Sequence, residues 1–182
     1  GDEDLLIVNG HVYPEATLET MDSDRAQPMV LFERISSGFS MFEADSTSTL
    51  FQPHKDRAAV FGDLDNDGDT DVIINQRGGA VRVLRNDVES ADPLVIYLKG
   101  NQQNPKGLGA TVHLVLKNGS VLTRWNHDGS GFQSSASTPL SISLGGKSPA
   151  QIKVVWADGS IQIVKDVPSQ GAYVIQQLPS VE

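Results

Sequence analysis

Apolar residues along the chain fall in short runs that are separated by Gly, Asn, Asp, Ser and Pro. Short runs between turn-forming residues are typical of β-strands, and hardly any segment has the spacing of an amphipathic helix. The pattern therefore predicts an all-β fold. Outside the hairpins described next, strands are expected at Asp4–Asn9, Val30–Glu33, Val72–Asn75, Val81–Leu84, Leu94–Leu98, Leu140–Leu144 and Ala172–Gln176.

Two β-hairpins are predicted in the second half of the chain. One covers Thr111 to Trp125 and turns at Asn118-Gly119, and the other covers Gln151 to Val164 and turns at Asp158-Gly159. Both dipeptides supply the positive φ angles of a two-residue type I′ turn. A turn of that length also determines which residues face each other across the hairpin.

The expected cross-strand pairs follow from these turns. They are Trp156 with Ile161, Val154 with Ile163, Leu116 with Val121, Val112 with Trp125 and His113 with Arg124. The first two pairs would form one apolar face with Ile152. The opposite faces carry Val155, Val164, Val115 and Leu122. Because both faces are partly apolar, we expect a sandwich or closely packed sheets, and not a sheet with one face in water.

The chain is expected to contain two domains. Two stretches have no strand character, Lys99–Gly109 and Asn126–Thr138, and Glu15–Pro28 is polar and expected to be a surface excursion. The boundary between the two domains is expected near Val88–Pro93. The predicted domains are therefore residues 1–90 and residues 91–182.

Composition excludes several classes of protein. A chain of 182 residues with 38% hydrophobic residues is long enough to bury a core. It has no apolar run of about 18 residues, so no membrane-spanning helix is expected. The absence of Cys excludes disulfides, thiolate metal sites and cysteine nucleophiles. No leader peptide opens the chain, so any export signal is expected to have been removed or to lie outside it.

The net charge of −9 argues against binding to nucleic acid phosphates. This charge is concentrated in one half of the chain. Residues 1–71 hold 16 acidic and 4 basic residues, whereas residues 72–182 hold 7 acidic and 10 basic residues. The acidic half therefore has a net charge of −12, and the function of these acidic residues needs an explanation.

A loop of alternating aspartates is the most specific chemical feature. The five carboxylates are Asp63, Asp65, Asp67, Asp69 and Asp71. Together they repel one another, and a hard divalent cation would neutralise them. Ca²⁺ takes six to eight oxygen ligands in flexible geometry, and alternate positions allow several side chains to turn inward while the backbone wraps the ion. Gly68 stands where the chain must bend, and Asp69 is expected to contribute its backbone carbonyl. The loop therefore predicts a calcium site.

Other interpretations of this loop are less favourable. An EF-hand needs a Glu at the twelfth position followed by a helix, but Ile74 stands there at the start of a predicted strand. A loop within a β-hairpin is expected instead. Mg²⁺ prefers to retain its waters and needs fewer carboxylates. The remaining alternative is a solvated acidic turn that binds no ion.

With these residues in view, the first half resembles an FG-GAP (VCBS-type) repeat, the calcium-loop blade of integrin-like β-propellers. The matching residues are Ala59-Val60-Phe61-Gly62-Asp63 through Asp71-Val72, continuing to Leu84-Arg85-Asn86. In addition, Leu6-Ile7-Val8-Asn9-Gly10-His11-Val12-Tyr13-Pro14 resembles a segment found in propellers of the ASPIC/UnbV family.

The second half resembles the ASPIC/UnbV domain itself. The matching residues are Gly107-Leu108-Gly109-Ala110, Gly129-Ser130-Gly131-Phe132 with Ser134, and Trp156-Ala157-Asp158-Gly159. The family usually has Pro where this chain has Ala157. The resemblance implies one complete and one partial propeller blade followed by an antiparallel, β-sandwich-like UnbV domain.

The resemblance also implies a place in the cell and a larger assembly. It indicates the C-terminal part of an extracellular, periplasmic or cell-surface propeller protein with calcium in its blade loop. Propellers close with about four to eight blades. We therefore expect either a longer parent protein or a blade that packs on the UnbV domain, on missing blades or on another chain.

The remaining candidate residues suggest no catalytic site. The four histidines, His11, His54, His113 and His127, have no metal-ligand spacing, and His11 is expected to organise a turn. His127, Asp128 and Ser130 resemble triad residues, but they are adjacent in sequence, whereas triads are assembled from distant segments. Tryptophans such as Trp125 and Trp156 at strand ends are more often core residues than sugar platforms.

Three functions of different classes can be weighed. The favoured one is a non-enzymatic, calcium-stabilised module for extracellular interaction or adhesion, with a protein or glycan partner. The second is a carbohydrate-binding module that uses the loop at residues 126–138 and an exposed Trp. The third, a hydrolase using His127 and Ser130, is not expected.

Overall fold

The computed structural model describes the chain except residues 1–2, 14, 16, 22–23, 44–47, 66, 68, 88–92, 132–133, 136–138 and 180–182, and except the side chains at 21, 130, 131 and 134. The chain divides into two compact units. The first comprises Gly1–Phe61, Asp71–Arg85 and Ser130–Ser134, and the second comprises Gly62–Thr70, Asn86–Gly129 and Ser135–Glu182. Each unit is described by itself below.

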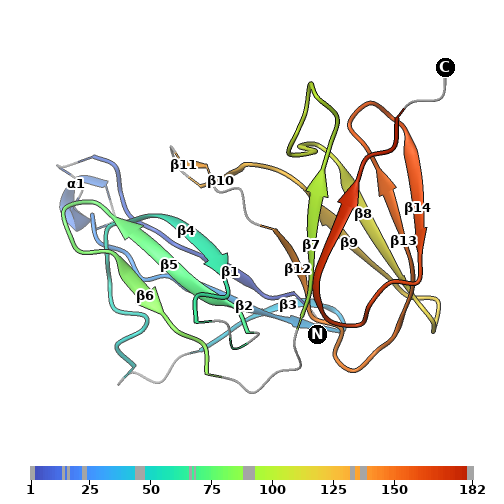
Figure 1. Cartoon of the computed structure of the whole chain (residues 1–182). Helices are drawn as coiled ribbons and strands as arrows, with labels where there is room; N and C mark the ends of the chain where they lie inside the picture. The colour runs from blue at the N-terminus through green and yellow to red at the C-terminus, as the bar shows by residue number, and fades with distance from the viewer. Residues whose placement is uncertain are drawn as a thin grey trace. The chain divides into compact units, whose positions relative to one another are not determined.

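The N-terminal elements form two three-stranded sheets (Figure 1). The first sheet has the order β1-β2-β3, with β1 at Leu5–Ile7, β2 at Val30–Ile35 and β3 at Gly38–Met41. The second has the order β4-β5-β6, with β4 at Asp56–Gly62, β5 at Asp71–Gln76 and β6 at Arg82–Leu84. One short helix, α1, covers Leu18–Met21.

The core of this unit is small. Met29, Ala59 and Ile74 are buried, and partly buried apolar side chains pack against them: Leu6, Val8, Phe51, Val72 and Leu84. Ile74 and Val72 lie two residues apart on β5 and so point to the same side of the sheet. The core thus places β5 firmly, and the acidic loop at residues 63–70 leads directly into it.

The second unit contains two larger sheets (Figure 1). One has the order β12-β7-β15, with β12 at Leu140–Ile142, β7 at Leu94–Lys99 and β15 at Gly171–Gln176. The other has the order β14-β13-β8-β9, with β14 at Ile161–Lys165, β13 at Pro149–Val155, β8 at Thr111–Leu116 and β9 at Val121–Trp125. A separate two-stranded sheet pairs β10 (Gly129–Gly131) with β11 (Ser134–Ser135), and its residues 130–134 are grouped with the first unit.

One buried core joins the two larger sheets. Leu94, Ile96, Ile142 and Ile175 come from the three-stranded sheet, and the four-stranded sheet supplies Val112, Leu114, Leu116, Ile152, Val154 and Trp156. Across the four-stranded sheet, Leu122, Leu114, Ile152 and Val164 form one continuous apolar row. The two sheets therefore share one hydrophobic core. The predicted antiparallel pairing is found at β12-β7, β14-β13, β13-β8 and β8-β9, whereas β15 runs parallel to β7.

The predicted hairpin registers were wrong by one residue. Val155 faces Ile161, Ile152 faces Val164, Val115 faces Val121 and Thr111 faces Trp125. The cause is the length of the turns. In each of the two dipeptides only the Gly has a positive φ, +86° at Gly119 and +85° at Gly159. This is typical of a three-residue loop with a glycine bulge, and not of a type I′ turn.

The change of register reverses the faces of the edge strands. Ile161 and Ile163 were predicted to share the apolar face with Ile152, but they are 59% and 56% exposed. His113 faces Thr123, and its Nδ1 lies 3.1 Å from Thr123 Oγ1, so the predicted pair with Arg124 is also wrong. The outer face of this sheet therefore retains apolar side chains at the surface.

The predicted strands outside the two hairpins are confirmed, within one or two residues at most ends. Five described elements were not predicted: α1, β3, β4 and, within the stretch expected to be a loop, β10 and β11. In the described part of the chain no sheet closes into a barrel. The predicted domain boundary falls largely on residues 88–92, outside the described residues.

Candidate functional site

The acidic loop connects two neighbouring strands of one sheet, as predicted. It leaves β4 at Gly62 and enters β5 at Asp71. Asp63, Asp65 and Asp71 each present a carboxylate oxygen, and these three oxygens all lie within 4.8 Å of one another. The loop thus gathers three of the five predicted ligands at one point.

This separation fits one calcium ion. Since Ca–O bonds measure about 2.3–2.6 Å, two ligand atoms on opposite sides of the ion lie about 4.6–5.2 Å apart. Three oxygens within 4.8 Å can therefore contact the same ion. At that separation each pair of full negative charges repels by about 1–3 kcal/mol, depending on the effective dielectric constant. A divalent cation would turn this repulsion into binding energy.

Asp67 and Asp69 do not belong to this group of three. Asp67 donates its backbone N–H to Asp63 Oδ1 at 3.2 Å, and Asp69 donates its N–H to Asp67 Oδ1 at the same distance. These bonds curl the loop around the carboxylates. The side chain of Asp67 thus accepts a hydrogen bond within the loop. The side chain of Asp69 is nearly buried, because the residue is only 6% exposed. Asn66 and Gly68, the expected bend, lie outside the described residues.

The strand after the loop excludes an EF-hand. Ile74, at the twelfth position, is completely buried in the core on β5, where an EF-hand would need a ligating Glu and then a helix. Asp71 is the first residue of the same strand and is 1% exposed. One of the three carboxylates is therefore fixed by the sheet and not by the loop.

A buried ion pair between β4 and β6 was not predicted. Asp56 on β4 accepts a hydrogen bond at 2.5 Å from Nη2 of Arg82 on β6, and the Asp56 side chain is fully buried. Asp56 Oδ1 and Arg82 Nε are buried without a hydrogen-bond partner in the described part of the chain. Because Asp56 and Arg82 are 26 residues apart, no local spacing indicates that they meet. The sequence offers one indication, which is that Asp56 alternates with Ala58 on β4 and so points to the same side of the sheet.

The residues of the hydrolase hypothesis have other contacts. Asp128 Oδ2 lies 3.6 Å from Lys106 Nζ, and His127 is exposed. The side chain of Ser130 lies outside the described residues. His11 accepts a hydrogen bond at Nδ1 from the Tyr13 N–H at 3.4 Å, which is the local turn contact expected for it.

The two tryptophans differ sharply in burial. Trp156 is 3% exposed and packs in the core, as expected. Trp125 is 65% exposed, so the same expectation was wrong for it. The difference follows from the hairpin register, because Trp125 faces Thr111 on the outer side of the sheet.

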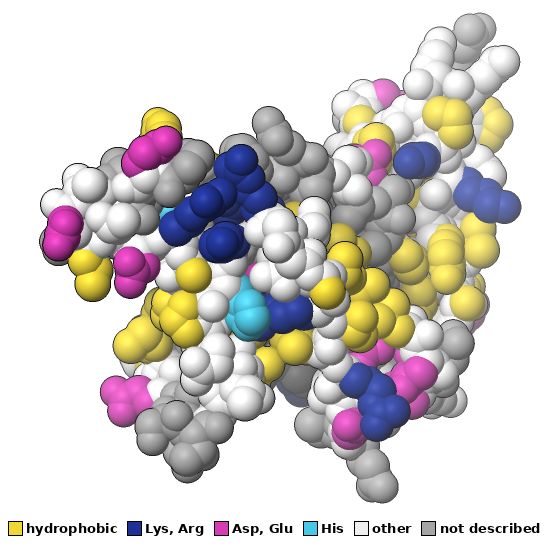
Figure 2. All heavy atoms as spheres, turned by 90° about the vertical axis from the view of Figure 1, so that its left-hand side faces the viewer, with side chains coloured by type: hydrophobic (Ala, Val, Ile, Leu, Met, Phe, Trp, Pro, Cys, Tyr) yellow, Lys and Arg dark blue, Asp and Glu magenta, His cyan; other side chains and the backbone are white. Residues whose placement is uncertain are grey.

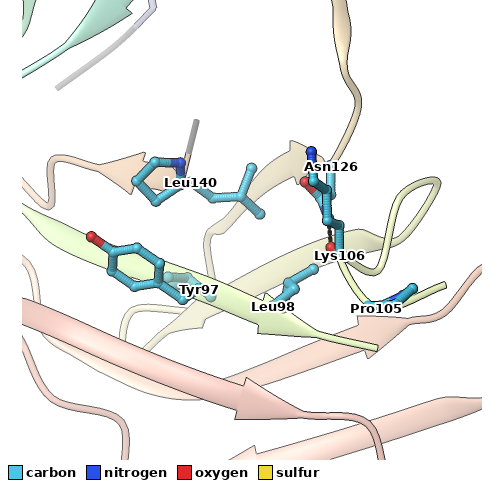
Figure 3. A pocket seen from close by; sticks show the side chains of 8 residues that line it. Tyr97, Leu98, Pro105, Lys106, Asn126 and Leu140 are labelled. Carbon is cyan, nitrogen blue, oxygen red and sulfur yellow. Dashed lines mark hydrogen bonds between the residues drawn. The ribbon is translucent and has the colours of Figure 1, made fainter. Parts of the chain in front are cut away.

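A shallow pocket of about 210 Å³ lies in the second unit. Its lining residues are Ile96, Tyr97, Leu98, Pro105, Lys106, Asn126, Pro139 and Leu140. Figure 3 shows the Tyr97 ring and Leu140 toward one end, and Pro105, Lys106 and Asn126 toward the other. Asn126 is held in place because its Nδ2 donates to the carbonyls of Lys106 and Gly107 at 2.8 and 2.9 Å.

Comparison with known proteins identifies the second half. Residues 100–181 match the family model described as ASPIC and UnbV. The match includes the Gly107-Leu108-Gly109-Ala110 and Trp156-Ala157-Asp158-Gly159 segments, so the predicted ASPIC/UnbV domain is confirmed. The FG-GAP resemblance at residues 59–86 stays a prediction. No curated protein matches the chain. Within the described residues, no helix is long and apolar enough to cross a bilayer.

Proposed function

We propose that the chain is a non-enzymatic, calcium-binding module for extracellular interaction or adhesion, and that it forms the C-terminal part of a larger propeller protein. The observation that carries the proposal is the group of three carboxylate oxygens from Asp63, Asp65 and Asp71 within 4.8 Å. Asp67 and Asp69 would complete the set through side-chain or backbone oxygens. Waters would supply the remaining ligands.

Calcium in this loop would serve a structural purpose. The ion would connect the end of β4 to the start of β5, because Asp63 follows one strand and Asp71 begins the other. Extracellular modules hold such ions with dissociation constants of about 10⁻⁴–10⁻³ M, which the calcium concentration outside cells can saturate. An extracellular, periplasmic or cell-surface location is therefore part of the proposal.

The FG-GAP resemblance of residues 59–86 supports the link to a propeller. A blade of that kind would contact further blades or another chain. The ASPIC/UnbV domain at residues 100–181 would follow it. The partner, a protein or a glycan, would bind the assembled module.

Thermal unfolding tests the calcium site. The wild-type protein should melt at a higher temperature with calcium than with a chelator, and Asp65→Ala should abolish most of that difference. Glu33→Ala is a matched control, because Glu33 is exposed on β2 and its loss also removes one negative charge. Identical melting curves of the wild type in calcium and in chelator would reject the proposal.

A carbohydrate-binding module is the second candidate. It is favoured by the 65% exposure of Trp125 and by the neighbouring residue Asn126, which opens the loop at 126–138 and lines the pocket with Tyr97. Aromatic faces and fixed polar groups are the usual elements of a sugar site. Binding to polysaccharide that disappears in Trp125→Ala or Tyr97→Ala would support this function, and the absence of binding to any glycan would count against it.

A further inference from the structure

Four segments of the first unit meet at one place and bring basic residues together. The Gly10 backbone bridges to Ala26, and Gln27 bridges to His54. The backbone N–H of Asp56 donates to the Asn9 carbonyl at 3.0 Å, and that of Arg77 donates to the Lys55 carbonyl at 2.9 Å. These segments carry the residues that we call the basic cluster: His11, Arg25, His54, Lys55, Arg57 and Arg77.

Two guanidinium groups of the basic cluster are held by one backbone segment. Arg57 donates from Nη1 to the Gly10 carbonyl and from Nη2 to the His11 carbonyl, both at 2.9 Å. Arg77 donates from Nη1 to the next carbonyl, that of Val12, at 3.3 Å. Both guanidinium groups therefore bind to the same three-residue backbone segment. Their orientation is thus set before any ligand arrives.

Gly10 makes this arrangement possible. A Cβ atom at Gly10 would lie 2.5 Å from Arg57 Nη1 and 2.8 Å from the Lys55 carbonyl carbon. Any side chain at this position would therefore displace Arg57 or the start of β4. The Asn-Gly-His segment thus has a physical explanation in the packing of Arg57.

The positive charge of the basic cluster is not balanced. In the part of the chain that the structure describes, Arg25, Lys55, Arg57 and Arg77 make no ion pair, and the adjacent Asp56 is paired with Arg82. Arg25 Nε is buried and has no hydrogen-bond partner among the described residues. Figure 2 shows basic side chains in dark blue gathered on the face that it draws, with histidine in cyan close to them.

A group of basic residues is unusual in this acidic half of the chain. Residues 1–71 hold only four basic residues against 16 acidic ones, and three of those four belong to the basic cluster. Acidic side chains are therefore plentiful in this half, yet Arg57 and Arg77 donate to backbone carbonyls, which carry no net charge. A bound anion would neutralise part of the positive charge of the basic cluster.

We propose that the basic cluster binds an oxyanion, that is, a carboxylate, sulfate or phosphate group of a ligand. The planar forks of Arg57 and Arg77 retain donors beyond those used for the carbonyls, and guanidinium forks match the two oxygens of an oxyanion. Arg25 and Lys55 add charge, and Arg25 Nε adds a donor in need of an acceptor. This site is independent of the calcium loop and selects an anionic partner.

Titration with simple anions tests the proposal. ¹⁵N NMR spectra of the full chain would be recorded with sodium sulfate, phosphate or acetate against sodium chloride at constant ionic strength. We expect saturable shifts at Arg25, Arg57, Arg77 and the backbone of residues 10–12. The three salts distinguish tetrahedral from carboxylate ligands, because the preferred anion should saturate at the lowest concentration.

Charge-matched variants separate a site from general electrostatics. Arg77→Gln should weaken binding by about tenfold or more, since a charge-assisted hydrogen bond is lost, while Arg77→Lys should retain part of it. Arg34→Gln removes the same charge from β2, where Arg34 packs over Phe39, and should bind like the wild type. Shifts that do not saturate, or an equal loss in Arg34→Gln and Arg77→Gln, would overturn the proposal. Backbone spectra of each variant without added anion verify that it is folded.

Discussion

At the scale of single residues, the sequence predicts contacts within one loop but not contacts between strands that are distant in sequence. The carboxylates of Asp63, Asp65 and Asp71 were predictable because their spacing within one loop determines that they meet. The pair of Asp56 with Arg82 was not, because two strands must first align before these residues come into contact. Local spacing thus revealed the candidate metal site, while the buried ion pair could be found only from the fold.

The buried pair leads to a prediction about stability. Asp56→Ala should destabilise the protein by about 3–5 kcal/mol, because it leaves Arg82 as an uncompensated charge in the sheet. The double variant Asp56→Ala with Arg82→Leu should recover part of that loss. Chemical denaturation measures both. A loss below about 1 kcal/mol for Asp56→Ala, the range of an exposed pair, would contradict this account.

Asp158 leads to a prediction about pH. Its Oδ1 accepts hydrogen bonds from Ser160 Oγ at 2.6 Å and from the Ser160 N–H at 2.9 Å, and these lower the pKa of Asp158 from its usual 3.8. Because the folded pKa is depressed, the stabilisation is present above the usual value and is lost as pH falls through the folded value. Ser160→Ala should raise the pKa of Asp158, as measured by ¹³C NMR titration of its carboxyl. An unchanged pKa would show that the Ser160 hydroxyl has no influence.

At the scale of elements, strands were predictable and register was not. Apolar runs mark strands such as β7 and β13, because a strand must bury a side chain at alternate positions. Asn-Gly and Asp-Gly, however, are compatible with both a two-residue turn and a three-residue loop with a glycine bulge. Packing decides between them, because the two-residue register would place Lys165 opposite Ile152 in the core row, where Val164 now lies.

Gly107, in the loop after β7, lies against core side chains, and substitution tests how closely it packs there. Gly107 has a φ of +63°, and a Cβ there would lie 3.0 Å from the Trp156 ring and 3.3 Å from Leu98 Cβ. Gly107→Ala should therefore destabilise the protein by about 1–3 kcal/mol through strain and overpacking. In Gly129→Ala, the matched control, the added Cβ meets nothing within 4 Å. Equal stability of the two variants by thermal unfolding would contradict the contact with Trp156.

At the scale of the whole molecule, charge and family point to different roles for the two halves. The first half concentrates the acidic residues, including the three carboxylates that face one another, and the second half contains the ASPIC/UnbV domain. One Ca²⁺ ion would reduce the formal charge from −9 to −7. The number of blades and the partner could not be predicted from the sequence. The closure of a propeller depends on contacts between neighbouring blades, and one repeat does not specify how many there are.

Calorimetric titration of chelator-treated protein with CaCl₂ tests the central claim most directly. One ion per chain should bind saturably, with a dissociation constant of about 10⁻⁴–10⁻³ M. Asp65→Asn should weaken this binding strongly, because it removes one of the three converging carboxylates. Glu33→Gln, which removes an exposed charge elsewhere, should leave it unchanged. A titration without saturable heat, or one that Asp65→Asn does not alter, would contradict the account.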